Sequence, residues 1–203
     1  LEVRLGCVVE AIEHGSGAGV TVHTADGPLN ADQAVLAVPL GVIKQGAIRI
    51  DPDPGLAERA SCLGVASLEK IVLQFEAPFW SQGTKRLIRI SDDRRFPGWN
   101  DLSSHTGAPT LVVFHNPRLA STFLDAPDRI PAALEARRQM YGTDVPEPVA
   151  THSTDWLGDP FAFGSYSFPS SGATAADMAA MGGRLSDRLV GAGEHTVPEH
   201  YGT

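Results

Sequence analysis

The hydrophobic and polar positions near the start of the chain follow the short period of β-strands. Strand-like runs occupy residues 7–12 and 20–24, and the glycine-rich residues 15–19 lie between them. Two such runs joined by a short turn predict a β-hairpin. A third run, residues 31–39, is apolar on both faces and ends at a proline, so we expect a strand in the middle of a sheet.

The segment Asp51-Pro52-Asp53-Pro54-Gly55 interrupts this pattern with stiff, turn-forming residues. We place a domain boundary near it. After it, residues 56–63 predict a short helix and residues 68–75 a strand. Strict alternation along this strand puts Lys70 on the face opposite to the most apolar one.

The rest of the chain alternates short strands with two helices. We expect strands at residues 87–91, 99–102, 110–115, 146–155 and 187–193, and helices at residues 127–141 and 173–181. The pattern predicts a folded chain of mixed α/β character.

Composition excludes several classes of function. The net charge is −8 and no basic cluster is present, so we expect no nucleic-acid partner. The apolar runs are far shorter than the roughly 20 residues of a membrane helix, so we expect no membrane association. Cys7 and Cys62 lack metal-ligand spacing, which predicts unpaired thiols, no metal and a reducing, cytoplasmic location. The first residues contain no basic leader, so we expect neither a signal peptide nor the true amino terminus.

Four segments carry a resemblance to one family, in the same order along the chain. They are residues 31–42, the run from Lys70 to Pro78-Phe79-Trp80, Asp155-Trp156 with Gly164-Ser165-Tyr166-Ser167, and Gly193-Glu194-His195-Thr196. Together they resemble segments of the flavin-dependent amine oxidases, which include monoamine, polyamine and L-amino-acid oxidases.

The resemblance implies an α/β fold with an α+β substrate domain. An incomplete FAD-binding, Rossmann-like sheet would use residues 1–51 and 161–203, and a mixed-sheet substrate-binding domain flanked by helices would use residues 52–160. The family's glycine fingerprint, G-x-G-x-x-G between a strand and a helix, is absent. Residues 15–19 link two predicted strands, so we reject them as a phosphate loop. We therefore expect an internal to C-terminal fragment that lacks an N-terminal segment of the same protein and is inactive when isolated.

The resemblance also implies an activity, the oxidation of an amine, polyamine or amino acid to an imine with O2 reduced to H2O2. FAD would be bound without a covalent link, because Ser165 stands where monoamine oxidases of animal mitochondria have a flavin-linked cysteine. The partners would then be a small-molecule amine and O2. A non-catalytic binding or scaffold module, or another FAD oxidase or desaturase of the same fold, is the alternative.

The resemblance assigns roles to individual residues. Lys70 would hold a water beside flavin N5, and with Tyr166 forms the expected catalytic pair. Trp156 and Tyr166 would form the aromatic wall of the substrate pocket. Thr203 stands where the family often has a tyrosine of the aromatic cage, so either the register slips by one or two positions and Tyr201 is the cage residue, or the cage is incomplete. The expected cofactor contacts are Val9, Trp156, Glu194, His195 and Thr196.

Each of these residues also has a purely structural interpretation. A strand lysine can be a solvated edge residue, and Trp156, Tyr166 and Val9 can be core residues. His195 can be a buried, hydrogen-bonded histidine. The substrate is not predicted, because neither the acids Asp92, Asp93 and Asp101 nor the arginines Arg86, Arg89, Arg94 and Arg95 can be ranked without a pocket.

Overall fold

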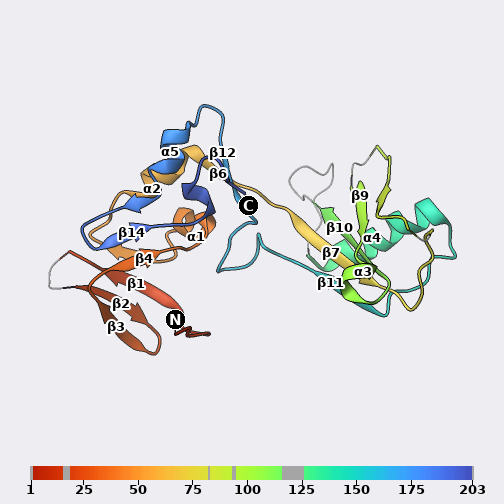
Figure 1. Ribbon diagram of the computed structural model, residues 1–203, viewed down its shortest axis with the longest axis horizontal. Helices are drawn as coiled ribbons and strands as arrows, with labels where there is room; N and C mark the ends of the chain where they lie inside the picture. The colour runs from red at the N-terminus through yellow and green to blue at the C-terminus, as the bar shows by residue number, and fades with distance from the viewer. Residues whose placement is uncertain (1, 16–18, 82, 93–94, 116–125, 203) are drawn as a thin grey trace. The chain divides into compact units, whose positions relative to one another are not determined.

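The computed structural model describes residues 2–15, 19–81, 83–92, 95–115 and 126–202. The chain forms two compact units (Figure 1). Unit 1 combines residues 1–66 with residues 157–203, and unit 2 consists of residues 67–156. Residues 52–66 and 157–160, which the sequence analysis assigns to a substrate-binding domain, lie in unit 1.

Unit 1 begins with a four-stranded sheet of order β3-β2-β1-β5. Strands β1 (Val9–Glu13) and β2 (Val20–Thr24) pair antiparallel, which confirms the predicted hairpin, although residues 16–18 of its turn lie outside the described residues. Strand β3 (Gly27–Ala31) continues the meander. Strand β5 (Arg49–Asp51) pairs parallel with β1 on the other side.

A second sheet of unit 1 brings together segments far apart in the sequence. Strand β4 (Ala34–Leu36) pairs parallel with β14 (Leu189–Gly191), which pairs antiparallel with β13 (Gly183–Arg184). The prediction that β4 lies in the middle of a sheet is wrong for the described residues. In this sheet β4 is an edge strand and Val35 is 66% exposed. A strand with apolar residues on both faces is expected to be covered on both sides, but its sequence does not say how many strands lie beside it.

Short helices and a two-stranded ribbon complete unit 1. They are α1 (Leu40–Gln45), α2 (Leu56–Arg59), η1 (Ala60–Cys62), α5 (Ala175–Ala179), η2 (Glu194–Thr196), and the antiparallel pair of β6 (Leu63–Val65) with β12 (Ser167–Pro169). Helix α5 starts at a capping box of Thr174 and Asp177, whose side chains each bond the other's backbone N–H. The core is aliphatic and includes Ile12, Leu40, Leu63, Met178 and Leu189.

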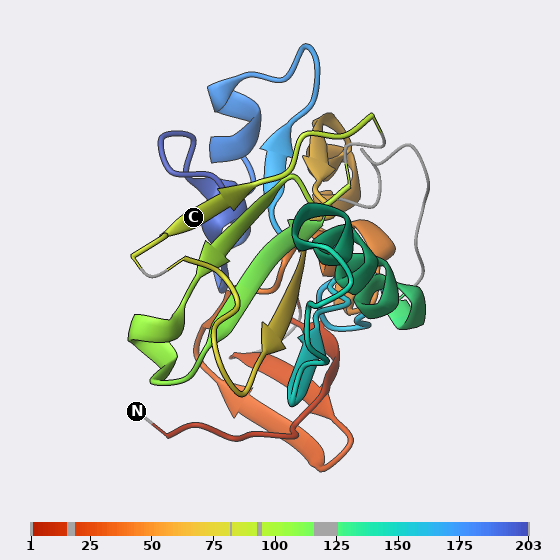
Figure 2. The same ribbon diagram turned by 90° about the vertical axis from the view of Figure 1, so that its right-hand side faces the viewer.

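Unit 2 is a five-stranded sheet of order β11-β7-β10-β9-β8 whose neighbours all pair antiparallel. Its elements are β7 (Glu69–Gln74), β8 (Arg86–Ile88), β9 (Gly98–Asp101), α3 (Ser103–Thr106), β10 (Thr110–His115), α4 (Ala126–Tyr141) and β11 (Ala150–Ser153). Helix α4, the predicted helix of residues 127–141, packs on one face of this sheet (Figure 2). The sheet face beneath α4 presents Ile71, Leu73 and Val113.

The core of unit 2 is rich in aromatic and charged side chains. Phe75, Phe79 and Trp80 meet edge to face with ring centroids 5.0 to 5.9 Å apart. Arg137 of α4 is fully buried among aromatic rings, with its guanidinium carbon 4.8 Å from the centroid of Trp99. Burial of this kind makes unit 2 unlike the aliphatic unit 1.

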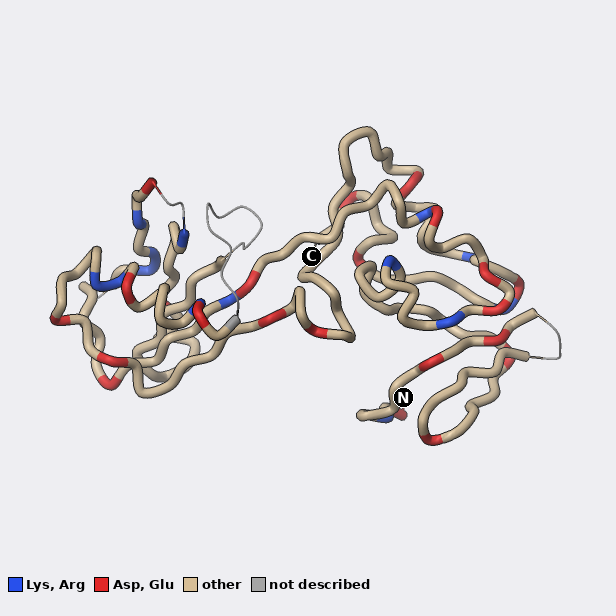
Figure 3. Tube along the Cα trace, turned by 180° about the vertical axis from the view of Figure 1, so that it is seen from behind, with Lys and Arg blue, Asp and Glu red and all other residues tan. Residues whose placement is uncertain are grey.

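Lys, Arg, Asp and Glu are interspersed along the chain rather than gathered in a basic patch (Figure 3). Among the described residues, no helix is both long and apolar enough to span a bilayer. Cys7 and Cys62 are free thiols, as predicted. The described part of the chain contains no cluster of side chains able to bind a metal ion.

Candidate functional site

Three of the four motif segments meet at one pocket of unit 1. The pocket has a volume of about 200 Å³. Its walls come from residues 37–41 after β4, from Gly164, Ser165 and Tyr166 before β12, and from Gly193, Glu194 and His195 after β14, with Val65 and Ala162 between them. Segments separated by more than a hundred residues in the sequence therefore share one small cavity.

Two glycines allow these walls to approach closely. A Cβ at Gly41 would lie 2.2 Å from the carbonyl oxygen of Ala162, and a Cβ at Gly164 would lie 2.1 Å from Cγ1 of Val65. Gly164 also has φ of +139°, a conformation that disfavours side chains. The glycines of the Pro39-Leu40-Gly41 and Gly164-Ser165-Tyr166 segments are thus required by close backbone approach.

Ser165 and Tyr166 are fixed by pairing with Ala66. The N–H and hydroxyl of Ser165 both donate to the carbonyl oxygen of Ala66, at 2.9 and 3.0 Å. The N–H of Ala66 donates to the carbonyl oxygen of Tyr166 at 2.8 Å. The Tyr166 side chain is 37% exposed and lines the pocket, and Gly202 lies against the edge of its ring.

Glu194 holds the pocket together from within unit 1. Its carboxylate accepts hydrogen bonds from the N–H and hydroxyl of Ser167, at 3.0 and 2.7 Å, and from the N–H of Gly202 at 2.8 Å. This acid thus ties β12 and the end of the chain to the turn after β14. Three donors already occupy the carboxylate, so its observed contacts are structural.

His195 and Thr196 follow in the same turn. His195 is 2% exposed and lines the pocket, and desolvation by burial lowers its pKa, although the nearby Glu194 acts in the opposite direction. The ring is therefore neutral at ordinary pH. Thr196 donates its hydroxyl proton to the carbonyl oxygen of Gly193 at 2.7 Å and packs against Gly182.

Val9 lies at a different, larger cavity of unit 1. This groove, about 500 Å³ in volume, runs along residues 4–9 and is also lined by Val38, Pro39 and Phe161. Val9 is half-buried and also packs against the aliphatic core. Pro39 lines both this groove and the pocket at Tyr166.

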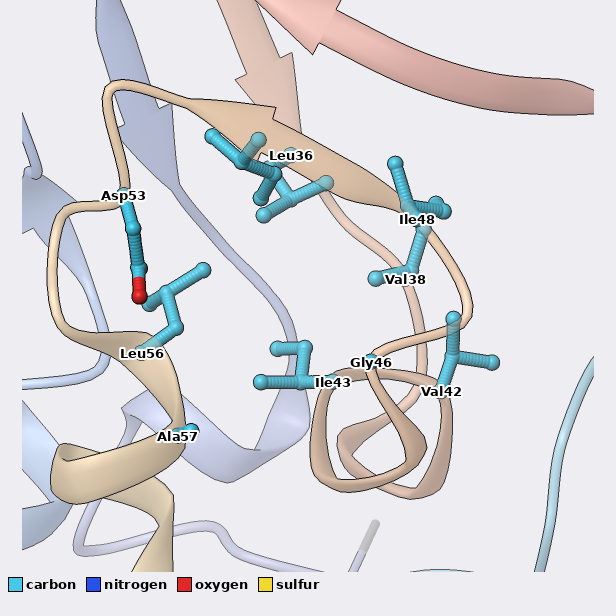
Figure 4. A pocket seen from close by; sticks show the side chains of 10 residues that line it. Leu36, Val38, Val42, Ile43, Gly46, Ile48, Asp53, Leu56 and Ala57 are labelled. Atoms are coloured by element: carbon cyan, nitrogen blue, oxygen red, sulfur yellow. The ribbon is translucent and has the colours of Figure 1, made fainter.

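A third cavity of unit 1 is almost wholly aliphatic (Figure 4). It has a volume of about 170 Å³, and its walls include Leu36, Ile43, Ile48 and Leu56. Asp53 is its one charged lining residue, and that carboxylate accepts the N–H of Gly55 at 2.8 Å. The cavity thus offers mainly shape and apolar surface, with the carboxylate of Asp53 as its one charged group.

Lys70 and Trp156 both belong to unit 2. The Lys70 side chain is exposed on the face of the sheet opposite α4, as the alternation predicts, and its cross-strand neighbour is Phe114, 38% exposed. Trp156 is 39% exposed and follows β11. The pocket of Tyr166 belongs to unit 1, so these two residues and that pocket lie in different units. Tyr201, in unit 1, is 44% exposed, and Thr203 lies outside the described residues.

The structure adds residues that the motifs missed. Glu69, next to Lys70, is fully buried on the face of Ile71 and Leu73. Its sequence signal was a carboxylate at a position that the strand alternation reserves for apolar side chains. Phe114 has no distinct signal in the sequence, because it ends an apolar run at residues 108–114. Asp93 and Arg94 lie outside the described residues.

This chain belongs to the family of flavin-containing amine oxidoreductases, which it matches over residues 1–203. It shares the fold of cyclohexylamine oxidase from Brevibacterium oxydans IH-35A, with a TM-score of 0.73 and 24% identity over 93% of this chain and 42% of that one. A putrescine oxidase structure with bound putrescine gives a TM-score of 0.75 at 19% identity, over 96% and 44% of the two chains. The mixed α/β fold class is thereby confirmed.

Among curated proteins, the chain is 31% identical to lysine-specific histone demethylase 1 homolog 1 of Arabidopsis thaliana, over 100% of this chain and 25% of that protein. It is also 31% identical to the protein FLOWERING LOCUS D of the same plant, over 96% and 26%. The chain therefore spans about a quarter of the length of these relatives.

The family implies FAD in the intact protein, and the pocket at Tyr166 fits the flavin end of that molecule. Its lining is apolar and backbone-rich, with Glu194 as the one acid and a neutral His195, which suits an uncharged planar ring system. The glycine-rich phosphate loop of dinucleotide folds is absent from the sequence, so this chain fits the flavin and not the whole cofactor.

Proposed function

We propose that this chain is the part of an FAD-dependent amine oxidase that lines the flavin and binds the amine substrate. The observation that carries this is the convergence of residues 37–41, 164–166 and 193–195 on one neutral pocket in a chain of this family. A non-catalytic module would have no requirement for a pocket assembled from these three motif segments.

When bound, FAD would supply the redox chemistry: it would accept the hydrogen of the C–H bond beside the amine nitrogen as a hydride, which carries two electrons, and pass those two electrons on to O2. Ser165 offers no thiol for a covalent link, so the cofactor would be bound non-covalently; the hydroxyl of Ser165 instead donates to the carbonyl oxygen of Ala66. The oxidised amine is an imine, which water hydrolyses to a carbonyl compound and a free amine.

The chain's own residues bind and orient. Tyr166 and Trp156 offer partly exposed ring faces, which attract a cationic amine and exclude water from it. Tyr201 adds a third ring in the register discussed above. Glu194, Thr196 and the neutral His195 shape the turn after β14, and Val9 and Pro39 extend the cofactor surface along the adjoining groove.

Lys70 carries the proton-handling role. Its ammonium group is free to reach solvent on the exposed sheet face, where it can hold a water and stabilise negative charge that builds on a reduced oxygen species. A cytoplasmic location, with O2 and a small amine as partners, fits this proposal.

The amine has a second candidate form, the N-methylated lysine side chain of a protein. One of the named relatives is lysine-specific histone demethylase 1 homolog 1, and removal of an N-methyl group is the same C–N oxidation. A small-molecule amine and a methyl-lysine peptide are therefore the two substrates to compare.

The test uses the full-length protein that contains this chain. We expect purification with a bound flavin, visible from its absorbance, and reduction of that flavin under anaerobic conditions by members of an amine panel or by methyl-lysine peptides. A flavin that no amine or methyl-lysine peptide reduces would contradict the proposal and favour a binding module or another oxidase.

The role of Lys70 is tested by Lys70→Met. We expect the rate of flavin reoxidation by O2 to fall about 100-fold with unchanged FAD content, because the positive charge beside the reacting oxygen is lost. Lys85→Met removes another exposed lysine of unit 2 and serves as the matched control. Equal reoxidation rates in both variants would remove Lys70 from the mechanism.

A further inference from the structure

Glu69 occupies a position that its strand reserves for apolar side chains. Residues 69, 71 and 73 of β7 all lie on the face covered by α4, and all three side chains are fully buried. A buried carboxylate costs several kcal/mol unless hydrogen bonds replace the lost water. The contacts that Glu69 makes therefore indicate what it is for.

Two hydrogen bonds of Glu69 reach the chain just after β11. Oε2 of Glu69 accepts the hydroxyl proton of Thr154 at 2.7 Å and the backbone N–H of Trp156 at 3.1 Å. The same Thr154 hydroxyl oxygen accepts the backbone N–H of Lys70 at 2.8 Å, and the Thr154 N–H donates to the Lys70 carbonyl oxygen at 3.0 Å. Lys70 and Trp156 are thus joined through one threonine and one carboxylate.

The buried cation Arg129 also holds residues 154 and 155. Arg129 of α4 is 2% exposed, and its Nη1 donates to the carbonyl oxygen of Thr154 at 2.8 Å and to the carboxylate of Asp155 at 3.1 Å. The hydroxyl and the carbonyl oxygen of Thr154, the carboxylate of Asp155 and the N–H of Trp156 are therefore each hydrogen-bonded to a buried charged side chain, either Glu69 or Arg129.

The bond from Trp156 to Glu69 lies just beyond the end of strand pairing between β11 and β7. The ladder between β11 and β7 ends with the pair Ser153 and Ile71, so the N–H of Trp156 has no strand partner. A hydrogen bond of 3.1 Å to the carboxylate of Glu69 replaces that partner, and hydrogen bonds to a charged acceptor are stronger than neutral ones. The side chain of Trp156 leaves this anchored backbone, partly exposed.

We propose that Glu69 is a positioning residue that, through Thr154, fixes Trp156 relative to Lys70. The assignment rests on the proposed function, in which these two residues face substrate and flavin. An apolar residue at position 69 would pack as well with Ile71 and Leu73 but would leave Trp156 unanchored. The carboxylate of Glu69 therefore serves to orient Trp156.

The first test needs no activity. Full-length protein labelled with 5-fluorotryptophan gives a fluorine resonance for Trp156, assigned by its loss in Trp156→Phe. In Glu69→Leu and in Thr154→Val we expect this resonance to shift or broaden while those of the buried Trp80 and Trp99 keep their positions. Thr151→Val, an exposed threonine on the same strand, is the matched control and leaves the Trp156 resonance unmoved.

The second test separates positioning from stability. In Glu69→Leu and Thr154→Val we expect the rates of flavin reduction at saturating amine and of reoxidation by O2 to fall together by about 10-fold, because a small misplacement of substrate-facing groups has effects of this size. Glu69→Gln and Thr154→Ser keep the acceptor or hydroxyl and restore most of both rates.

The outcomes are distinguishable. An unmoved Trp156 resonance, or rates within twofold of the unmodified protein in Thr154→Val, would overturn the positioning role, and Thr154→Val decides this even where Glu69→Leu fails to fold. A protein that binds no flavin or oxidises no amine would instead overturn the proposed function, and the fluorine resonances would still report whether Glu69 anchors Trp156.

Discussion

The two units of this chain build their sites by different means. Unit 1 shapes a pocket from backbone, using glycines at close approaches and a core of aliphatic side chains. Unit 2 buries whole charged groups, Glu69, Arg129 and Arg137, under its sheet and helix. The composition of the two units also differs. Unit 1 has 13 Asp and Glu residues and 6 Lys and Arg residues, nearly all outside its core. Unit 2 has 11 Asp and Glu residues and 10 Lys and Arg residues.

The difference teaches how each unit serves its proposed role. A neutral flavin ring needs a surface of the right shape, which backbone and small residues give without any added charge. A substrate wall needs individual side chains held in fixed orientations, which hydrogen bonds to buried charges provide more precisely than packing. The following predictions test that contrast in the full-length protein, from the largest expected effect to the smallest.

The pocket wall at Gly164 should tolerate no side chain. Gly164→Ala places a Cβ within 2.1 Å of Val65 at a positive φ, so we expect the free energy of unfolding to fall by about 4 kcal/mol. Gly172 also has a positive φ, of +89°, but no atom lies within 4 Å of its Cβ position, so Gly172→Ala should cost about 1 kcal/mol. Denaturant unfolding measures both, and equal losses would contradict the close-approach argument.

Unit 2 should be the acid-sensitive part because of His115. This ring is 1% exposed, and its Nε2 has no hydrogen-bond partner within the described part of the chain. Desolvation, then Arg129 and Arg95, lower its pKa from 6.5 to about 4, against an opposing effect of Glu69. The folded state therefore binds fewer protons than the unfolded state between these pH values. Its contribution is complete above pH 6.5, and about 3 kcal/mol is lost as pH falls toward 4.

Replacing His115 by Leu should remove this acid-dependent loss. Between pH 7 and pH 4, the free energy of unfolding should fall by about 3 kcal/mol more in the unmodified protein than in His115→Leu. His105→Leu, at an exposed histidine of α3, should keep the original slope. Parallel pH profiles for His115→Leu and the unmodified protein would show that His115 does not set the acid response.

Substitution of Arg137 tests whether every buried charged side chain of unit 2 stabilises the folded state. Its Nε and Nη2 have no hydrogen-bond partner among the described residues, burial lowers its pKa, and its contacts are the rings of Phe79, Trp99 and Tyr141 at 4.7 to 5.6 Å. We expect Arg137→Met to raise the free energy of unfolding by about 1 kcal/mol, since the desolvation cost is removed while volume is kept. A loss on this substitution would mean that the cation–π contacts outweigh desolvation.

The surface charges of unit 1 should matter least. Arg184 and Asp187 form an ion pair at 3.4 Å with both side chains mostly exposed. Arg184→Ala should change the free energy of unfolding by about 0.3 kcal/mol, within the range of exposed pairs. Thermal unfolding at low and high salt checks this, and an effect as large as that of His115→Leu would remove the contrast between the units.

Local pattern was enough for much of the fold. The hairpin of β1 and β2, the strand β7 with Lys70 on its exposed face, the helix α4 and the capped helix α5 follow from periodicity and turn residues, which act over a few positions. The motif segments likewise identified most of the pocket lining around Ser165, Tyr166 and His195. The failure at β4 came from a property that is not local, the number of strands beside it.

What the sequence determined by itself was therefore which residues form many of the strands and helices and which short segments resemble the motifs of the family, because alternation and turn propensity depend on near neighbours. Tertiary structure alone decided that Glu194 is occupied by Ser167 and Gly202, that Glu69 reaches Thr154 and Trp156, and that three motifs share one pocket. These contacts join residues 8 to more than 100 positions apart, where no periodic pattern records which side chains will meet.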